Sequence, residues 1–278
     1  MRIRGLVDLL TGRPKHPVGA DGRMALSDHF RELRARLIKA VLVLAVGIAV
    51  ALFFFDQLFD LVLGPYNQAL EALPEGTSFP TTRGAAGGLM LYLKLCGFAS
   101  LVCTSPYWLY QIWGFILPGL HPHERKWSRI FAAIAGPLFL CGVLLGYFTL
   151  PKGLELLIGL NPEGVTNLVD FNEYLQFFTR TLLVFGISFE IPVFVVMLNL
   201  AGIVSGRALG AHRPWIIVGT FIFAAIATPS ADPFTMTLMA VPMVVLFLLS
   251  EVIARFNDRR RRARRPYAGL SPDELSPL

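Results

Sequence analysis

Apolar and polar residues of this chain are arranged in long blocks, and the first block shows how one kind passes into the other. Residues 24–50 read MALSDHFRELRARLIKAVLVLAVGIAV. Charged residues fill one face of its first half, and four apolar residues recur on the other face at helical spacing: Leu26, Phe30, Leu33 and Leu37. Ser27 and Asp28 suit the start of a helix. We predict one unbroken helix that begins amphipathic and continues into an apolar layer.

Six apolar blocks are each predicted to form a membrane-spanning helix. They cover residues 37–55, 89–117, 130–150, 174–200, 214–228 and 233–250. A helix needs about 20 residues to cross about 30 Å of hydrocarbon, which the first four blocks supply. The last two hold only about 15 and 18 residues, so the bilayer would thin there or the pair would sit in a groove of the protein. The fold class expected is an all-α integral membrane protein with six transmembrane helices, the last two short.

Prolines and a buried acid indicate where these helices bend. Pro106 predicts a kink in the second span, because the residue before a proline disfavours helical geometry. Arg180, Glu190 and Pro192 predict interruptions in the fourth span. The loop 56–88 is rich in glycine, proline and acids, and we expect a short capping or re-entrant helix near residues 58–72.

Composition supports the membrane class. The chain is 54% hydrophobic with a mean hydropathy of +0.58, which is too apolar for an ordinary soluble domain. Its three cysteines lie in apolar blocks without metal-ligand spacing, so no metal site or disulfide framework is expected. The first 23 residues lack the apolar run of a signal peptide. We expect a flexible basic lead at 1–23, a membrane domain at 24–256 and a basic, polar tail at 257–278.

The distribution of charge predicts the orientation. About 20 of the 25 Lys and Arg residues lie in residues 1–36, 118–129, 202–213 and the tail, whereas the opposite loops contain only Arg83 and Lys152. Cytoplasmic loops carry the excess of basic residues, so both termini are expected in the cytoplasm. The net charge of +6 then describes one face of a membrane protein and not a nucleic-acid binder. The basic tail is expected to contact anionic lipids.

Three carboxylates are candidates for binding chemistry. Glu32 precedes the first span and Glu124 lies in the turn after the second, on the same predicted side. If these spans pack together, the two carboxylates could converge on a cationic ligand, for which arginine is best suited. Two simpler readings stay open at this point: Glu32 could form a surface pair with Arg36 four residues on, and Glu124 could be a solvated turn residue.

Glu190 differs because it lies inside an apolar block. An acid at mid-span costs about 3 kcal/mol unless it finds water or a partner, and Arg180 is nearly three turns away. A polar cavity reached by Glu190 is therefore expected. Asp232 has a simpler local reading as the N-cap of the last helix, ahead of Pro233.

Sequence motifs for catalysis are missing. The chain has no phosphate-binding glycine loop in a strand–helix setting, no HExxH and no supportable Ser-His-Asp arrangement, so neither an enzyme nor a cofactor is expected. A proton-coupled small-solute transporter using Glu190 is an alternative, but the inverted repeat it predicts is not found. A passive scaffold with a lipid-binding tail would leave Glu190 unexplained.

Four segments, in order, resemble the TatC family, the multispanning core of the twin-arginine protein translocase. They read MALSDHFRELRARL, SPYWLYQIWGFILPGLHPHER, FGISFEIPV and ATPSADPFTMTLMAVPM, and the resemblance covers about residues 24–256. It implies a receptor in a bacterial-type cytoplasmic membrane for signal peptides with paired arginines on folded cargo proteins. It also implies the single-span partners TatA and TatB, further TatC copies, and transport driven by the proton-motive force.

The resemblance implies roles for individual residues at the cytoplasmic face. Glu32 and Glu124 match acidic positions for the arginine-containing region of the signal peptide. The surrounding motifs contribute four more residues: His29, Arg34, Phe115 and Pro118.

Further roles are implied within and beyond the membrane. Glu190 matches a glutamate that lines the concave face of a cup-like bundle, and Asp232 matches an acid at the periplasmic tip of the short helices. Pro65 and Pro106 match prolines that shape the outer cap and the second span. Met236 stands where many relatives have glutamine, so the polar contact with a docked partner helix expected there is altered.

Overall fold

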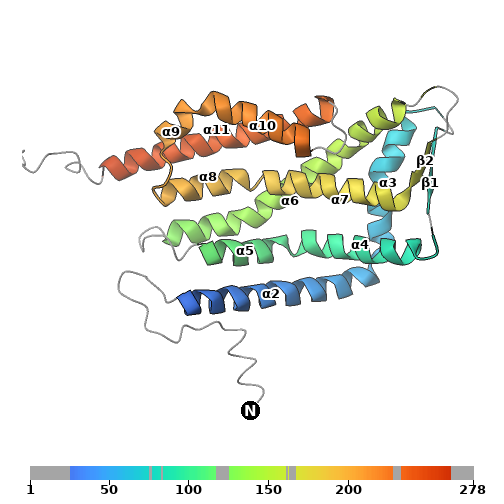
Figure 1. Cartoon of the computed structure of the whole chain (residues 1–278), viewed down its shortest axis with the longest axis horizontal. Helices are drawn as coiled ribbons and strands as arrows, with labels where there is room; N and C mark the ends of the chain where they lie inside the picture. The colour runs from blue at the N-terminus through green and yellow to red at the C-terminus, as the bar shows by residue number, and fades with distance from the viewer. Residues whose placement is uncertain are drawn as a thin grey trace, which may run out of the picture.

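A computed structural model describes residues 26–74, 77–82, 84–116, 125–160, 162, 167–227 and 233–263. Its elements in chain order are α2 (Leu26–Phe53), α3 (Phe55–Glu71), β1 (Ser78–Thr81), α4 (Gly87–Cys103), α5 (Ser105–Ile116), α6 (Arg125–Gly159), β2 (Asn167–Asp170), α7 (Phe171–Ser188), α8 (Ile191–Leu200), α9 (Gly206–Ala211), α10 (Arg213–Ala227) and α11 (Pro233–Ala263). Most of these helices run along one common axis, while α6 crosses the bundle obliquely (Figure 1). At one end α3 lies across the bundle beside the two strands (Figure 1).

Four continuous stretches are long and apolar enough to cross a membrane. They cover Ser27–Phe53, Ala133–Gly159, Phe171–Leu200 and Met236–Arg260. The pair α4 and α5 meets the same test only when the two are taken together, and α10 is a shorter apolar helix of 15 residues. The described residues therefore contain four such stretches, or five with the bent pair, so the chain is a multi-pass membrane protein.

The bend between α4 and α5 confirms the kink predicted from Pro106. The two helices meet at 59° around Thr104, two residues before the proline. The break frees carbonyl groups that must find other donors. Trp108 supplies one by donating from its indole Nε1 to the carbonyl of Leu101 across 2.9 Å. A Cβ at Gly136 would lie 2.5 Å from Cα of Pro106, so this glycine lets α6 approach the bend.

The interruption predicted at Glu190 and Pro192 is confirmed, since α7 ends at Ser188 and α8 begins at Ile191. The interruption predicted at Arg180 was wrong, because α7 runs through that residue without a break. Glu190 lies at the break, with Pro192 in the first turn of α8. The short helix expected after the first span is α3, which begins three residues earlier than predicted, at Phe55.

The prediction that the last helix is short was wrong. α11 has 31 residues and continues past Ser250 to Ala263, so the boundary drawn at residue 256 falls inside it. No proline or glycine follows Ser250 within the helix, and the arginine-rich stretch has good helix propensity. Only α10 of the final pair is short.

A small sheet was also not predicted. β1 and β2 pair in parallel, with Ser78 opposite Asn167 and Thr81 opposite Asp170. The hydroxyl groups of Tyr66 on α3 and Ser78 lie 2.9 Å apart, and Tyr174 on α7 donates to the carbonyl of Val62 across 2.6 Å. These bonds attach α3 and the sheet to the end of the bundle.

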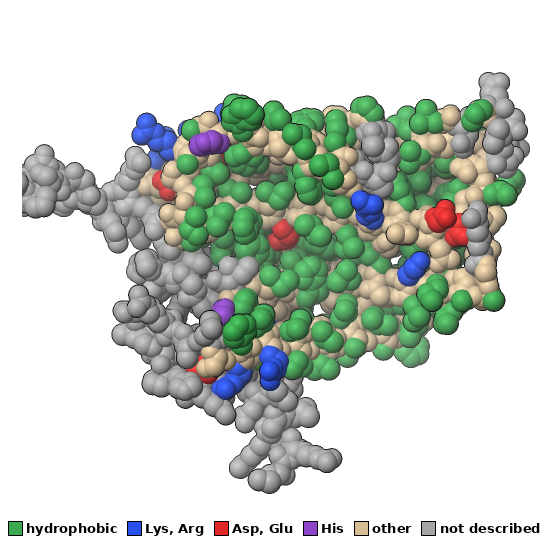
Figure 2. All heavy atoms as spheres, in the orientation of Figure 1, with side chains coloured by type: hydrophobic (Ala, Val, Ile, Leu, Met, Phe, Trp, Pro, Cys, Tyr) green, Lys and Arg blue, Asp and Glu red, His purple; other side chains and the backbone are tan. Residues whose placement is uncertain are grey.

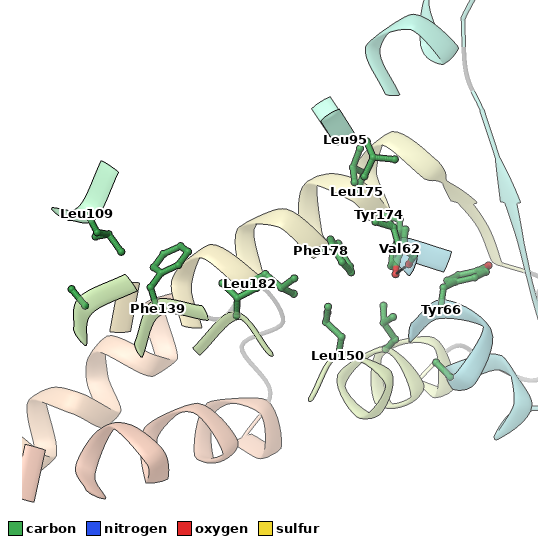
Figure 3. Packing of buried hydrophobic residues seen from close by; sticks show 14 of the residues in the cluster. Val62, Tyr66, Leu95, Leu109, Phe139, Leu150, Tyr174, Leu175, Phe178 and Leu182 are labelled. Carbon is green, nitrogen blue, oxygen red and sulfur yellow. Dashed lines mark hydrogen bonds between the residues drawn. The ribbon is translucent and has the colours of Figure 1, made fainter. Parts of the chain in front are cut away.

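The main hydrophobic core lies where α3, α4, α6 and α7 meet (Figure 3). Phe139 of α6 and Leu175 and Phe178 of α7 are fully buried there. The outside is also apolar: hydrophobic side chains cover most of the face in Figure 2, with charged side chains gathered toward its ends and only a few between. Burial is uneven, because only 6% of the apolar window of α2 is buried inside the protein, against 50% for α7 and α8.

Candidate functional site

The beginning of α2 and the end of α5 meet through aromatic and polar contacts. The rings of His29 and Phe115 stack with centroids 4.3 Å apart and an angle of 21° between their planes. One helical face of α2 carries His29, Glu32 and Arg36, and Arg36 donates from Nη1 to Oε1 of Gln111 on α5 across 3.3 Å. A Cβ at Gly114 would lie 2.6 Å from that Nη1, so the glycine makes room for the guanidinium group.

Glu32 and Arg36 form the ion pair that their spacing allowed. Nε and Nη2 of Arg36 lie 2.9 and 2.6 Å from the same oxygen, Oε1 of Glu32. The side chains are 19% and 24% exposed, so the pair is partly shielded from water. Within the described part of the chain, Oε2 of Glu32 takes part in no hydrogen bond. Among the described residues, Glu32 thus keeps one acceptor oxygen for another donor.

An apolar groove of about 520 Å³ runs along the contact between α2 and α5, beside these polar groups. Arg36 and Gln111 are its two polar lining residues and lie about one helical turn inside Leu33 and Phe115. The rest of the lining is almost entirely apolar: Leu33, Leu37, Ala40, Val41, Leu44, Leu101, Trp108, Ile112 and Phe115. The groove can therefore accept an apolar segment whose neighbouring polar residues reach Glu32.

Glu190 lies on the other side of α5 from this groove. Nε1 of Trp113 donates to Oε2 of Glu190 across 3.2 Å, while Oε1 is buried and has no hydrogen-bond partner in the described ranges. Gln111 and Trp113 are two residues apart, about 200° around the helix, so α5 presents one to α2 and the other to the α7–α8 break. Glu190 does not line the groove.

The predicted site residues are placed as follows. His29, Glu32 and Phe115 come together at the junction of α2 and α5. Arg34 is exposed and lies about 200° around α2 from Glu32, so it is not part of that cluster. Met236 packs against the small apolar cluster formed by residues of α7, α10 and α11. Glu124, Pro118 and Asp232 lie outside the described residues.

The sequence did not predict the roles of two α5 side chains: Gln111, which binds Arg36 beside Glu32, and Trp113, which binds Glu190. Trp113 is buried and donates a hydrogen bond to Glu190. Gln111 gave no signal on its own. A polar residue between aromatic ones in an apolar block is the only sign that could have marked it. Among the described residues no cluster of His, Cys, Asp and Glu suits a metal ion.

Comparisons with known proteins agree with this architecture. The family model for Sec-independent protein translocase protein (TatC) matches residues 28–242. The Sec-independent protein translocase protein TatC of Frankia casuarinae is 43% identical over 272 residues, which cover 93% of this chain and 74% of that protein. The Escherichia coli protein of the same name is 34% identical over 240 residues, covering 86% and 91%. A crystal structure of the twin arginine translocase receptor TatC in DDM matches with a TM-score of 0.67 at 30% identity, over 81% of this chain and 99% of that one.

Proposed function

Because the chain belongs to the TatC family of Sec-independent protein translocase proteins, we propose that it receives twin-arginine signal peptides where α2 meets α5. The observation that carries the proposal is the state of Glu32. Its Oε1 is held by Arg36, and its Oε2 accepts no hydrogen bond from any described residue. A guanidinium group of the signal peptide can bind this second oxygen without displacing Arg36.

The second arginine is assigned to Glu124, which lies outside the described residues, eight positions after the last residue of α5. Two carboxylates make the site selective for paired arginines. Arg offers a planar fork with several donors, whereas Lys is a compact charge that cannot bridge two acceptors in the same way. Partial burial of the pair strengthens these bonds relative to bulk water. His29 and Phe115 hold the two helices together beside the carboxylate.

The apolar part of the signal peptide is assigned to the groove between α2 and α5. Its polar residues, Arg36 and Gln111, lie in the half nearer Glu32, and the apolar remainder suits the hydrophobic segment that follows the charged one in a signal peptide. Glu190 acts separately, on the far side of α5, as the intramembrane carboxyl that lines the concave side of the bundle.

Topology and partners complete the proposal. Six helices cross the membrane with both termini in the cytoplasm, and α10 crosses where the bilayer is locally thin. TatA and TatB dock on the α10–α11 pair near Asp232 and Met236, further TatC copies join the complex, and the proton-motive force drives transport. The basic end of the chain contacts anionic lipids.

Peptide binding to the full chain in nanodiscs tests the receptor role. We expect a labelled twin-arginine peptide to bind, and a twin-lysine peptide to bind at least about tenfold more weakly, since a hydrogen bond to a charged group contributes about 1.5–3 kcal/mol. Glu32→Gln and Glu124→Gln should each cause a similar loss. Glu71→Gln is the matched control, because Glu71 is an exposed acid at the far end of α3.

Equal binding of both peptides by all variants would contradict the proposal. The peptide would then sense only apolar surface and net charge. That result is also what a proton-coupled solute transporter using Glu190 predicts, so the same experiment separates the two functions.

A further inference from the structure

A second polar site lies at the other side of the bundle, between α9 and α11. Here a cavity of about 340 Å³ is lined by Arg207, Arg255, Asp258 and Arg259. None of these residues belongs to the junction of α2 and α5. Three of the four lining residues carry a guanidinium group, so the cavity is a candidate anion site.

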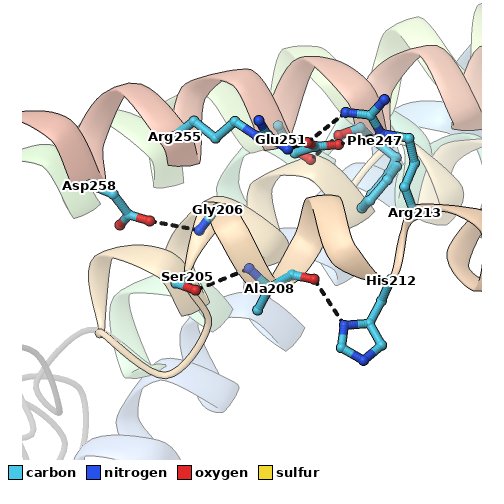
Figure 4. A network of polar contacts seen from close by, with 10 residues as sticks. Ser205, Gly206, Ala208, His212, Arg213, Phe247, Glu251, Arg255 and Asp258 are labelled. Atoms are coloured by element: carbon cyan, nitrogen blue, oxygen red, sulfur yellow. Dashed lines mark hydrogen bonds and ion pairs between the residues drawn. The ribbon is translucent and has the colours of Figure 1, made fainter.

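The backbone around the cavity is held in place by the carboxylate of Asp258. Its Oδ2 accepts from the backbone N–H of Gly206 across 2.7 Å, and its Oδ1 accepts from Nδ2 of Asn199 across 2.9 Å (Figure 4 shows the first bond). A Cβ at Gly206 would lie 2.6 Å from the backbone N of Arg255, so α9 packs directly on α11. The lining arginines are therefore brought together by fixed helices.

A neighbouring carboxylate accounts for one of the lining arginines. Glu251, which is 2% exposed, binds Nη2 of Arg255 at 2.7 Å and Nη2 of Arg213 at 2.8 Å (Figure 4). Both acids of this region thus have their partners inside the protein.

Arg207 and Arg259 remain without such a partner. Both are exposed, and neither makes a hydrogen bond or ion pair with any residue in the described ranges. The region holds four guanidinium groups against the two carboxylates of Glu251 and Asp258, which leaves an excess of two positive charges beside the cavity. A bound anion would offset that excess.

We propose that this cavity binds the phosphate group of an anionic phospholipid. Guanidinium groups match phosphate oxygens in bidentate geometry, and two free ones face a space large enough for the group. The position of the cavity along α11 identifies the source as a lipid, because the apolar stretch long enough to cross a membrane, Met236–Arg260, ends beside the cavity. The lining arginines therefore lie at the depth of the lipid headgroups, where a phosphate can reach Arg207 and Arg259.

This inference rests on the lipid contact proposed above but not on the signal-peptide role. A general attraction between a basic tail and the membrane would involve every nearby arginine, whereas this site uses Arg207 and Arg259 and excludes Arg260. Arg260 is the next residue of α11, yet its guanidinium carbon lies 4.2 Å from the ring centre of Phe256 and it does not line the cavity.

Native mass spectrometry of the full chain in detergent tests the site by titration with phosphatidylglycerol. We expect Arg207→Gln and Arg259→Gln each to weaken binding about fivefold, and the double variant about 25-fold, from the usual contribution of one basic residue near an anionic lipid. Arg260→Gln is the matched control and should bind like the unmodified chain. The affinity of phosphatidylcholine for the unmodified chain should not exceed the affinity of phosphatidylglycerol for the double variant. Thermal unfolding should be the same for all variants.

Three results would overturn the proposal. The double variant could bind phosphatidylglycerol as well as the unmodified chain does. Arg260→Gln could weaken binding as much as the other substitutions, which would indicate a diffuse charge effect. Inorganic phosphate could displace the lipid at equal concentration, which would make free phosphate the ligand. Twin-arginine peptide binding, measured on the same samples, should be unchanged in the double variant, so failure of this site is distinguishable from failure of the receptor role.

Discussion

Nε1 of Trp113 and Oε2 of Glu190 are joined by a 3.2 Å hydrogen bond between α5 and the α7–α8 break. This bond is the one described polar contact of the Glu190 side chain, whose other oxygen is buried without a hydrogen-bond partner in the described ranges. We expect Trp113→Phe to lower the free energy of unfolding by about 1–3 kcal/mol, because it leaves a buried carboxyl without its donor. Thermal unfolding in detergent measures this.

Trp215→Phe is the control for that measurement, since the Trp215 side chain is 76% exposed on α10. Its unfolding temperature should stay close to that of the unmodified chain. An equal change in both variants would mean that the loss comes from the size of the indole ring and not from the bond to Glu190.

The stacking of His29 on Phe115 gives a prediction about peptide affinity. His29→Ala should weaken twin-arginine peptide binding by about threefold to tenfold, because an aromatic pair contributes about 0.5–1.5 kcal/mol to holding α2 against α5. His29→Phe keeps the stack and should keep the affinity. If both variants lose affinity equally, the imidazole nitrogens contact the peptide directly and the positioning role is wrong. Titration of labelled peptide into nanodiscs measures both.

Close packing of α6 on α7 depends on Gly142. A Cβ there would lie 2.6 Å from the carbonyl oxygen of Phe185 and 2.9 Å from Cα of Gly186, and backbone atoms cannot move aside as a flexible side chain can. Gly142→Ala should therefore reduce stability by about 1–3 kcal/mol. Gly97→Ala, where a Cβ would meet open space, should leave stability unchanged or raise it slightly. Thermal unfolding measures the stability of both variants. If the two substitutions destabilise the protein equally, the close approach of α6 and α7 at Gly142 is contradicted.

The buried carboxylate of Glu251 holds α10 against α11. Glu251→Gln removes the charge that Arg213 and Arg255 share, and we expect faster hydrogen exchange in α10, with a stability loss of about 1–3 kcal/mol. Glu155→Gln breaks an exposed pair with Lys152 and should have almost no effect. Unchanged exchange in α10 after Glu251→Gln would show that apolar contacts alone hold the helix.

Local signals in the sequence predicted the parts of the fold that short stretches determine. Pro106 predicted the bend before α5, and Glu190 with Pro192 predicted the break before α8, because backbone sterics act between adjacent residues. The Glu32–Arg36 pair was available from its spacing in the helix.

Contacts between distant segments could not be predicted in this way. Arg213 and Glu251 are 38 residues apart, and the pairing of β1 with β2 joins residues nearly 90 positions apart. The length of α11 was misjudged because Glu251 interrupts the apolar run after Ser250, whereas the helix continues through it into an arginine-rich stretch with good helix propensity.

Uneven burial along the bundle bears on how the chain is assembled during synthesis. Only 6% of the apolar window of α2 is buried by other parts of the protein, so most of this first helix keeps contact with lipid in the finished bundle. It can leave the insertion machinery before its neighbours are made. The stretch from α7 through α8 buries 50% of its window and carries Glu190 at its break. That later stretch packs on α5 and α6, so the order of synthesis supplies its partners before it arrives.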